Sequence, residues 1–152
     1  MSITIKNLES ALAGESMAHI KYRYFAKIAR EEGYEDVAKH FEHTADQEIK
    51  HAWGHLELLI GKPSTKECLQ KAIDGETYEY KEMYPQFKQH AEWEMQDSVA
   101  KEFEEQIKES ASHAEDFRKI LQKAEKRFAA LKKLQNTLNI LLTKKSNMHG
   151  VT

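Results

Sequence analysis

Three glutamates stand at positions where ionised side chains are rarely found. Glu15, Glu48 and Glu76 fall on the apolar stripes of predicted amphipathic helices. A buried, ionised carboxylate is costly unless it pairs with a cation or binds a metal. His51 lies at i+3 from Glu48, so both side chains project from one face of the same helix. Helical bundles build di-metal sites from two helices that each provide a Glu and two that each provide a Glu-x-x-His. These residues therefore predict such a site, and their ligand types suit iron or manganese.

Apolar residues at helical spacing predict the four amphipathic helices that would hold this site. The expected helices span residues 7–33 (or from Ser2), residues 35–60, residues 73–87 with a kink at Pro85, and a fourth that starts near Asp97. The connection at residues 61–72, with a short helix at about residues 65–73, would provide a long crossover. The elements predict an all-α four-helix bundle.

The sequence also contains an internal repeat, which relates the two halves of this bundle. Residues 11–16 recur as residues 72–77 at an offset of 61, residues 37–41 recur as 99–103 at an offset of 62, and His51-Ala52 recurs as His113-Ala114 at 62. One inserted residue between the first two blocks accounts for the change of offset. Each half is therefore predicted to be a helical hairpin.

Composition excludes several other classes of protein. The 152 residues include 23 Lys and Arg against 25 Asp and Glu, so the net charge of -2 offers no general attraction for nucleic acid. Gly 6 and Pro 2 are too few for a sheet-rich fold. Cys68, the single cysteine, excludes a disulfide framework and a cysteine-type zinc site. No run of 18 apolar residues predicts a membrane span, and the N-terminus lacks the pattern of a signal peptide, so a cytoplasmic protein is expected.

The motifs resemble those of the rubrerythrins over residues 7–121. They are Gly14-Glu15-Ser16 with Tyr22, Ala45-Asp46-Gln47-Glu48-x-x-His51, and Gly75-Glu76-x-x-Glu79 followed by Met83-Tyr84-Pro85. Rubrerythrins are ferritin-like di-iron proteins that reduce hydrogen peroxide to water. The resemblance implies two iron ions, with manganese or a mixed pair as the alternative. The ligands that it implies are Glu15, Glu48, His51, Glu76, Glu79 and His113, and Tyr22 and Tyr84 match tyrosines that form hydrogen bonds near the metals.

Two features depart from the family's pattern. The rubredoxin-like electron-transfer domain is absent from this sequence, so a separate electron-donor protein is expected. The second bridging Glu of the family should stand at the counterpart of Glu48, and that position is Ser110. Glu109 is adjacent and would reach the site if the helix were slightly rotated. Glu79, whose counterpart in the first half is Ala18, brings the implied glutamates to four, which balance the charge of two divalent ions.

The C-terminal region has a different character from the rest of the chain. Residues 118–145 contain nine Lys or Arg and one acidic residue, Glu125. Apolar residues recur there at near-heptad spacing, namely Leu121, Ala124, Phe128, Leu131, Leu134, Leu138 and Leu141. We therefore expect a bundle at residues 1–125 and a helical extension at 126–152 that folds back or docks on a second chain, in a homodimer or larger homo-oligomer.

Three hypotheses about function follow. The first is a non-haem di-iron peroxidase of rubrerythrin type, with hydrogen peroxide as substrate. The second is a ferroxidase or iron-handling protein on the same ligands. The third is an interaction module that retains an inactive remnant of the site. Peroxide turnover separates the first from the second, and metal content separates both from the third.

Overall fold

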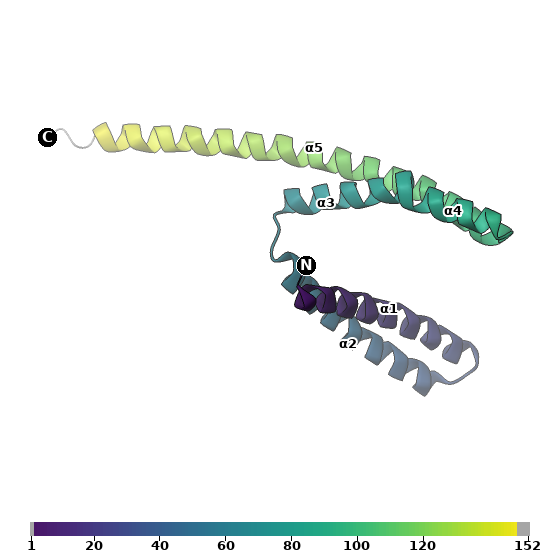
Figure 1. Ribbon diagram of the computed structural model, residues 1–152. Coiled ribbons are helices and arrows are strands. Elements are labelled where there is room, and N and C mark those ends of the chain that lie inside the picture. Colours follow the sequence, from purple (N-terminus) through teal and green to yellow (C-terminus); the bar gives the residue numbers. More distant parts are fainter. Residues whose placement is uncertain (1, 149–152) are drawn as a thin grey trace. The chain divides into compact units, whose positions relative to one another are not determined.

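The computed structural model describes residues 2–148, and the side chains of residues 2–140. The elements in chain order are α1 (Ile3–Glu31), α2 (Glu35–Ile60), α3 (Thr65–Tyr78), the π-helix η1 (Glu79–Met83), α4 (Tyr84–Trp93) and α5 (Asp97–Met148). No strand occurs among the described residues, which confirms the all-α prediction. The chain divides into two compact units, one up to Pro63 and the other from Ser64 onward (Figure 1).

The first unit is a hairpin of α1 and α2. Gly33 turns the chain between the helices with a φ of 87°, a conformation that costs glycine little. Alanines line the contact between the two helices and are almost fully buried, namely Ala26, Ala29, Ala38, Ala45 and Ala52. Because a methyl group is so small, the two backbones approach closely along this seam. This approach brings the middle of α1, where Glu15 lies, next to the middle of α2.

The second unit packs α3, η1 and α4 against the N-terminal half of α5, as Figure 1 shows. Met95, with a φ of 57°, forms the turn between α4 and α5. Buried alanines again line the contacts at Ala91, Ala100 and Ala114. The second unit therefore uses the same mode of packing as the first.

Aromatic trios show that the repeat in sequence is also a repeat in structure. In the first unit the ring centroids of Tyr22 and Phe41 lie 6.0 Å apart, and those of Phe25 and Phe41 lie 5.6 Å apart. The trio at the same offset of 62 in the second unit is Tyr84, Phe87 and Phe103, with the corresponding distances 6.0 Å and 5.7 Å. The corresponding rings of the two units therefore lie at nearly the same distances from one another.

The connection between the units is shorter than expected, because only residues 61–64 lie between α2 and α3. Ser64 begins α3 with a capping box, in which its hydroxyl accepts from the backbone N–H of Glu67 and its own N–H donates to the Glu67 carboxylate. This cap satisfies the first turn of the helix, so helix formation starts at Thr65. The expected short helix and the expected third helix are therefore one continuous element up to Tyr78.

The expected kink at Pro85 is also replaced by a different feature. The helix passes from α3 into η1, where the Tyr84 N–H donates to the Glu79 carbonyl, five residues earlier. Pro85 follows in the first turn of α4, where a missing N–H is tolerated. The π-turn thus takes the place of a break in the helix.

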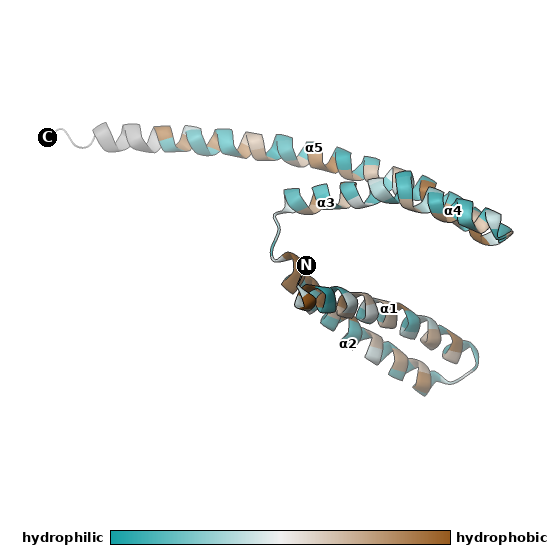
Figure 2. Cartoon of the chain, viewed as in Figure 1, coloured by the Kyte–Doolittle hydropathy of each residue, from teal (hydrophilic) through white to brown (hydrophobic). Residues whose placement is uncertain are grey.

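The C-terminal extension continues α5 without interruption. This helix has 52 residues and does not fold back within its described length, so it is about 78 Å long. Hydrophobic and hydrophilic residues are interspersed along the coloured part of α5 (Figure 2). Phe128, Leu131, Leu134 and Leu138 are each at least half exposed, and the side chain of Leu141 lies outside the described residues. The domain boundary expected at residue 125 stays a prediction.

Among the helices that the structure describes, none combines the length and the apolar run that crossing a membrane would need.

Replacement of Ala45 by Leu should destabilise the first unit, because the Ala45 side chain is fully buried between α1 and α2. Overpacking of such a contact lowers the free energy of unfolding by about 1–3 kcal/mol. Urea denaturation followed by circular dichroism measures the loss. The control is Ala13→Leu on the exposed face of α1, which should change little. Equal denaturation midpoints for the two variants would show that the seam is looser than described.

The exposed stripe on α5 should mediate self-association. We expect the full-length chain to be a dimer or larger oligomer, and truncation after Lys119 should lower its mass in solution, as measured by light scattering. The double variant Leu131→Glu, Leu138→Glu should do the same without shortening the chain. Its control, Lys132→Gln with Lys133→Gln, changes charge beside the stripe and should leave the mass unchanged. A monomeric full-length protein at high concentration would contradict this prediction.

Candidate metal centre

The first unit brings three of the predicted ligands together. Glu15 on α1 and Glu48 and His51 on α2 each offer a ligand atom, and these atoms lie within 4.8 Å of one another. His51 Nδ1 is 3.6 Å from Glu48 Oε2 and 3.9 Å from Glu15 Oε2. The spacing within α2 aligns Glu48 with His51, and the alanine seam brings Glu15 opposite them. This is a set of oxygen and nitrogen donors that a transition metal would bind.

The electrostatics of this cluster favour a bound cation. The pKa of Glu15 is raised, first by a hydrogen bond with the Glu48 carboxyl, then by burial, and then by the negative charge of Glu48. Two carboxyl groups this close share a proton more readily than they both ionise. A divalent cation in place of that proton would allow both to ionise.

The second unit holds three more of the predicted ligands. Glu76 lies on α3, Glu79 begins η1, and His113 lies on α5. His113 Nδ1 is 3.4 Å from Glu76 Oε2, which corresponds to the pairing of His51 with Glu15 in the first unit. The Ser110 hydroxyl donates to Glu79 Oε2 at 2.9 Å. The repeat has therefore placed an equivalent carboxylate–imidazole pair in each unit.

One carboxylate oxygen of the second unit is left without the partner that burial demands. Glu76 Oε2 is buried, and no residue that the structure describes forms a hydrogen bond with it, although the His113 ring is nearby. A buried acceptor without a partner carries a desolvation cost that a metal ion would relieve. The residues of both units therefore fit metal ligands.

Burial distinguishes Ser110 from its neighbour Glu109. Ser110 is 3% exposed, whereas Glu109 is exposed. Ser110 therefore lies on the inner face of α5. Glu109 still affects the site electrostatically, because its charge is among those that raise the pKa of Tyr84. Its role as a ligand stays a prediction.

The two predicted tyrosines lie at the same place in the two aromatic trios. Burial raises the pKa of the Tyr84 hydroxyl above its usual range, and the charges of Glu79, Glu76 and Glu109 add to this effect. Tyr84 therefore keeps its proton at neutral pH. Tyr22 stacks on Phe41. Direct participation of either hydroxyl in catalysis stays a prediction.

His55 was not identified from the sequence, yet its charge is one of those that lower the pKa of Glu15. It lies one heptad after Glu48 on α2, and this spacing was the only available signal. The repeat gave no support, since the counterpart at an offset of 62 is Phe117.

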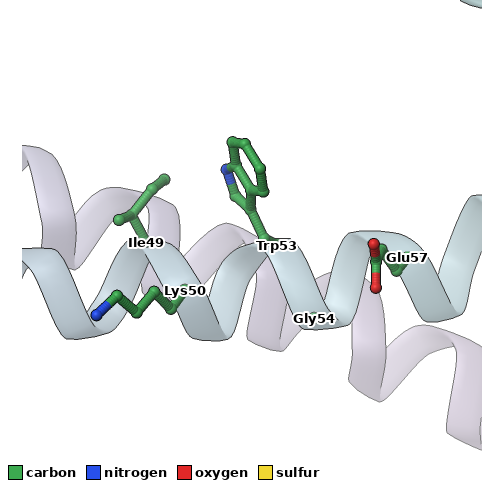
Figure 3. A pocket seen from close by; sticks show the side chains of 5 residues that line it. All are labelled: Ile49, Lys50, Trp53, Gly54 and Glu57. Carbon is green, nitrogen blue, oxygen red and sulfur yellow. The ribbon is translucent and has the colours of Figure 1, made fainter.

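A separate hollow on α2 lacks comparable chemistry. Figure 3 shows its lining of Ile49, Lys50, Trp53, Gly54 and Glu57. Glu57 provides the one carboxylate of this set, and Lys50 the one cation. The hollow therefore offers no metal-ligand cluster.

Comparison with known proteins supports this interpretation. The family model described as Rubrerythrin matches residues 6–121. Rubrerythrin of Porphyromonas gingivalis is 38% identical over 79% of this chain and 66% of that protein. The putative rubrerythrin of Methanocaldococcus jannaschii is 35% identical over 82% of this chain and 72% of that protein. Nigerythrin of Nitratidesulfovibrio vulgaris is 36% identical over 75% of this chain and 63% of that protein. The chain thus spans about two thirds of the length of these relatives.

Glu48→Gln should have opposite effects on stability and on metal binding. In the metal-free protein the raised pKa of Glu15 means that stability falls as the pH rises through that pKa, because ionisation places two charges together. Removal of the Glu48 charge should therefore raise the melting temperature in a chelator at pH 7 and reduce its dependence on pH. The same variant should lose metal affinity.

The control for this variant is Glu9→Gln, which neutralises an exposed carboxylate on α1. Equal melting temperatures for the two variants would show that Glu15 and Glu48 do not repel one another.

Proposed function

Because the chain belongs to the rubrerythrin family, we propose that it is a di-iron peroxidase that reduces hydrogen peroxide to water with electrons from a separate donor protein. The expected ferritin-like bundle is the fold of this family. The observation that carries the proposal is the cluster of Glu15, Glu48 and His51 in the first unit. Its pairing of a carboxylate with an imidazole recurs in the second unit, where His113 lies beside Glu76.

The proposed ligands are four carboxylates and two imidazoles. They are Glu15, Glu48 and His51 of the first unit and Glu76, Glu79 and His113 of the second. Four negative charges neutralise two divalent ions, so the set is complete in charge without a fifth carboxylate. Iron is the proposed metal, with manganese or a mixed pair as the alternative, because the donors are mainly oxygens.

The reaction converts one peroxide molecule, two electrons and two protons into two water molecules. Two ferrous ions held by these carboxylates and imidazoles would supply the two electrons, and the donor protein would restore them. The chain's own residues hold the ions and keep protons in place. Tyr84 is protonated at neutral pH and lies close enough to Glu79 and Glu76 for their charges to act on it, so we assign it the role of a hydrogen-bond donor beside the carboxylates.

The experiment that tests this proposal measures metal content and turnover on the same full-length protein. Elemental analysis should find about two metal ions per chain, and anaerobic protein loaded with ferrous iron should consume hydrogen peroxide repeatedly in the presence of a chemical reductant. His51→Ala should lower the metal content and the turnover. The control is His43→Ala, which removes an imidazole from the same helix outside the ligand set.

The outcomes separate the alternatives. Two ions per chain with iron oxidation but without sustained peroxide turnover would favour a ferroxidase or iron-handling protein. Less than one ion per chain, with no uptake of added ferrous iron, would exclude both enzyme proposals and leave an interaction module.

A further inference from the structure

The two halves of the repeat differ at two ligand positions, and the differences are complementary. The first half has Glu48 on α2, where the second half has Ser110 on α5. The second half has Glu79, where the first half has Ala18. Each half therefore provides two of the proposed ligand glutamates and one of the histidines. In the first half the second glutamate is on the helix that also carries the histidine, and in the second half it is not.

The structure shows where the relocated carboxylate reaches. Ser110 is on the inner face of α5 and is 3% exposed, and its hydroxyl donates to Glu79 Oε2 at 2.9 Å. The Glu79 carboxylate thus crosses from η1 to the position on α5 where the repeat would place a glutamate. Glu79 of η1 thus provides the carboxylate at this position, and Ser110 of α5 holds it through the hydrogen bond.

This hydrogen bond is not what a hydroxyl within a helix usually forms. Serine and threonine in helices commonly donate to the carbonyl four residues earlier in their own helix. Thr44 donates in this way to the His40 carbonyl, and Thr137 to the Lys133 carbonyl. The Ser110 hydroxyl instead donates to the Glu79 carboxylate on η1, so its hydrogen bond links two elements.

The π-turn supplies the extra residue that accompanies this change. The offset between the halves is 61 from Glu15 to Glu76 and 62 from Tyr22 to Tyr84, so the inserted residue lies between Glu76 and Tyr84. The segment η1 occupies this interval and begins at Glu79. A single inserted residue is the usual origin of a π-turn, and such turns are frequent at functional sites. The insertion and the relocated glutamate therefore coincide.

From these observations we propose that Ser110 is a positioning residue, whose hydroxyl fixes the Glu79 carboxylate in the place of the glutamate that α5 lacks. This inference rests on the proposed function, since the carboxylate so placed would be a metal ligand. Ser110 itself is a neutral donor and contributes no ligand charge.

The test is an exchange of the two positions. Ferrous iron is titrated anaerobically into the metal-free, full-length protein, and equilibrium dialysis with elemental analysis gives the ions bound per chain and their affinities. Glu79→Ala should weaken one of the two ions at least tenfold, and the double variant Glu79→Ala, Ser110→Glu should restore it, because the second half then has the arrangement of the first. Glu79→Gln repeats the loss with a side chain of the same size and guards against a folding defect.

The role of the hydroxyl is tested separately. Ser110→Ala should weaken the same ion by about ten- to a hundredfold, which is typical of the loss of a group that orients a ligand. Ser110→Thr retains the hydroxyl and should keep most of the affinity. If Ser110 had a purely structural role, Ser110→Ala would instead lower the melting temperature of the metal-free protein. The affinities of both ions would then stay at their wild-type values.

Three results would overturn the inference while the wild-type protein binds two ions. They are unchanged iron binding in both Glu79 variants, an exchange variant that binds no better than Glu79→Ala, and equal affinities in the Ala and Thr variants of Ser110. A wild-type protein that binds no iron would instead overturn the proposed function, so the two failures are distinguishable.

Discussion

The cost of removing carboxylates from water is the constraint on which the rest of the structure depends. Glu15 and Glu48 approach closely enough to raise the pKa of Glu15, and one oxygen of Glu76 is buried without a hydrogen-bond partner among the described residues. Such groups make a hairpin less stable by itself. The surrounding residues must therefore hold the backbone firmly enough to keep these carboxylates in place when no cation compensates them.

Both hairpins hold their helices together with the same two features. Alanines at the contacts let the helices approach closely, which leaves little freedom for one helix to slide along the other. The aromatic trios pack between the helices of each unit, and Phe41 in one unit and Phe103 in the other contact both of their partner rings. Buried alanines and stacked rings thus form the same frame in each unit. This frame explains why His51 and His113 approach their carboxylates in the same way.

Much of the fold was predictable because it follows from local pattern. Helical periodicity identified α1, α2 and the start of α5, and the repeat identified Glu76 and His113 as the counterparts of Glu15 and His51. The sequence predicts a helix from about Thr65, but not that it continues without a break into the next predicted helix, so the expected connection is longer than the observed one. The contact of Ser110 with Glu79 could not be predicted, because it depends on how η1 packs against α5. The influence of His55 on Glu15 likewise depends on packing.

The single extra residue in η1 has a geometric consequence for everything that follows it. Each residue of an α-helix turns the chain by about 100° around the axis, so an insertion without compensation would rotate all later side chains away from their partners. The wider π-turn absorbs this rotation within one turn. Glu76 before it and Tyr84 after it consequently both keep their faces toward α5. The π-turn thus joins a part of the helix that carries a proposed ligand to a part that carries an aromatic ring, and both parts face the same partner helix.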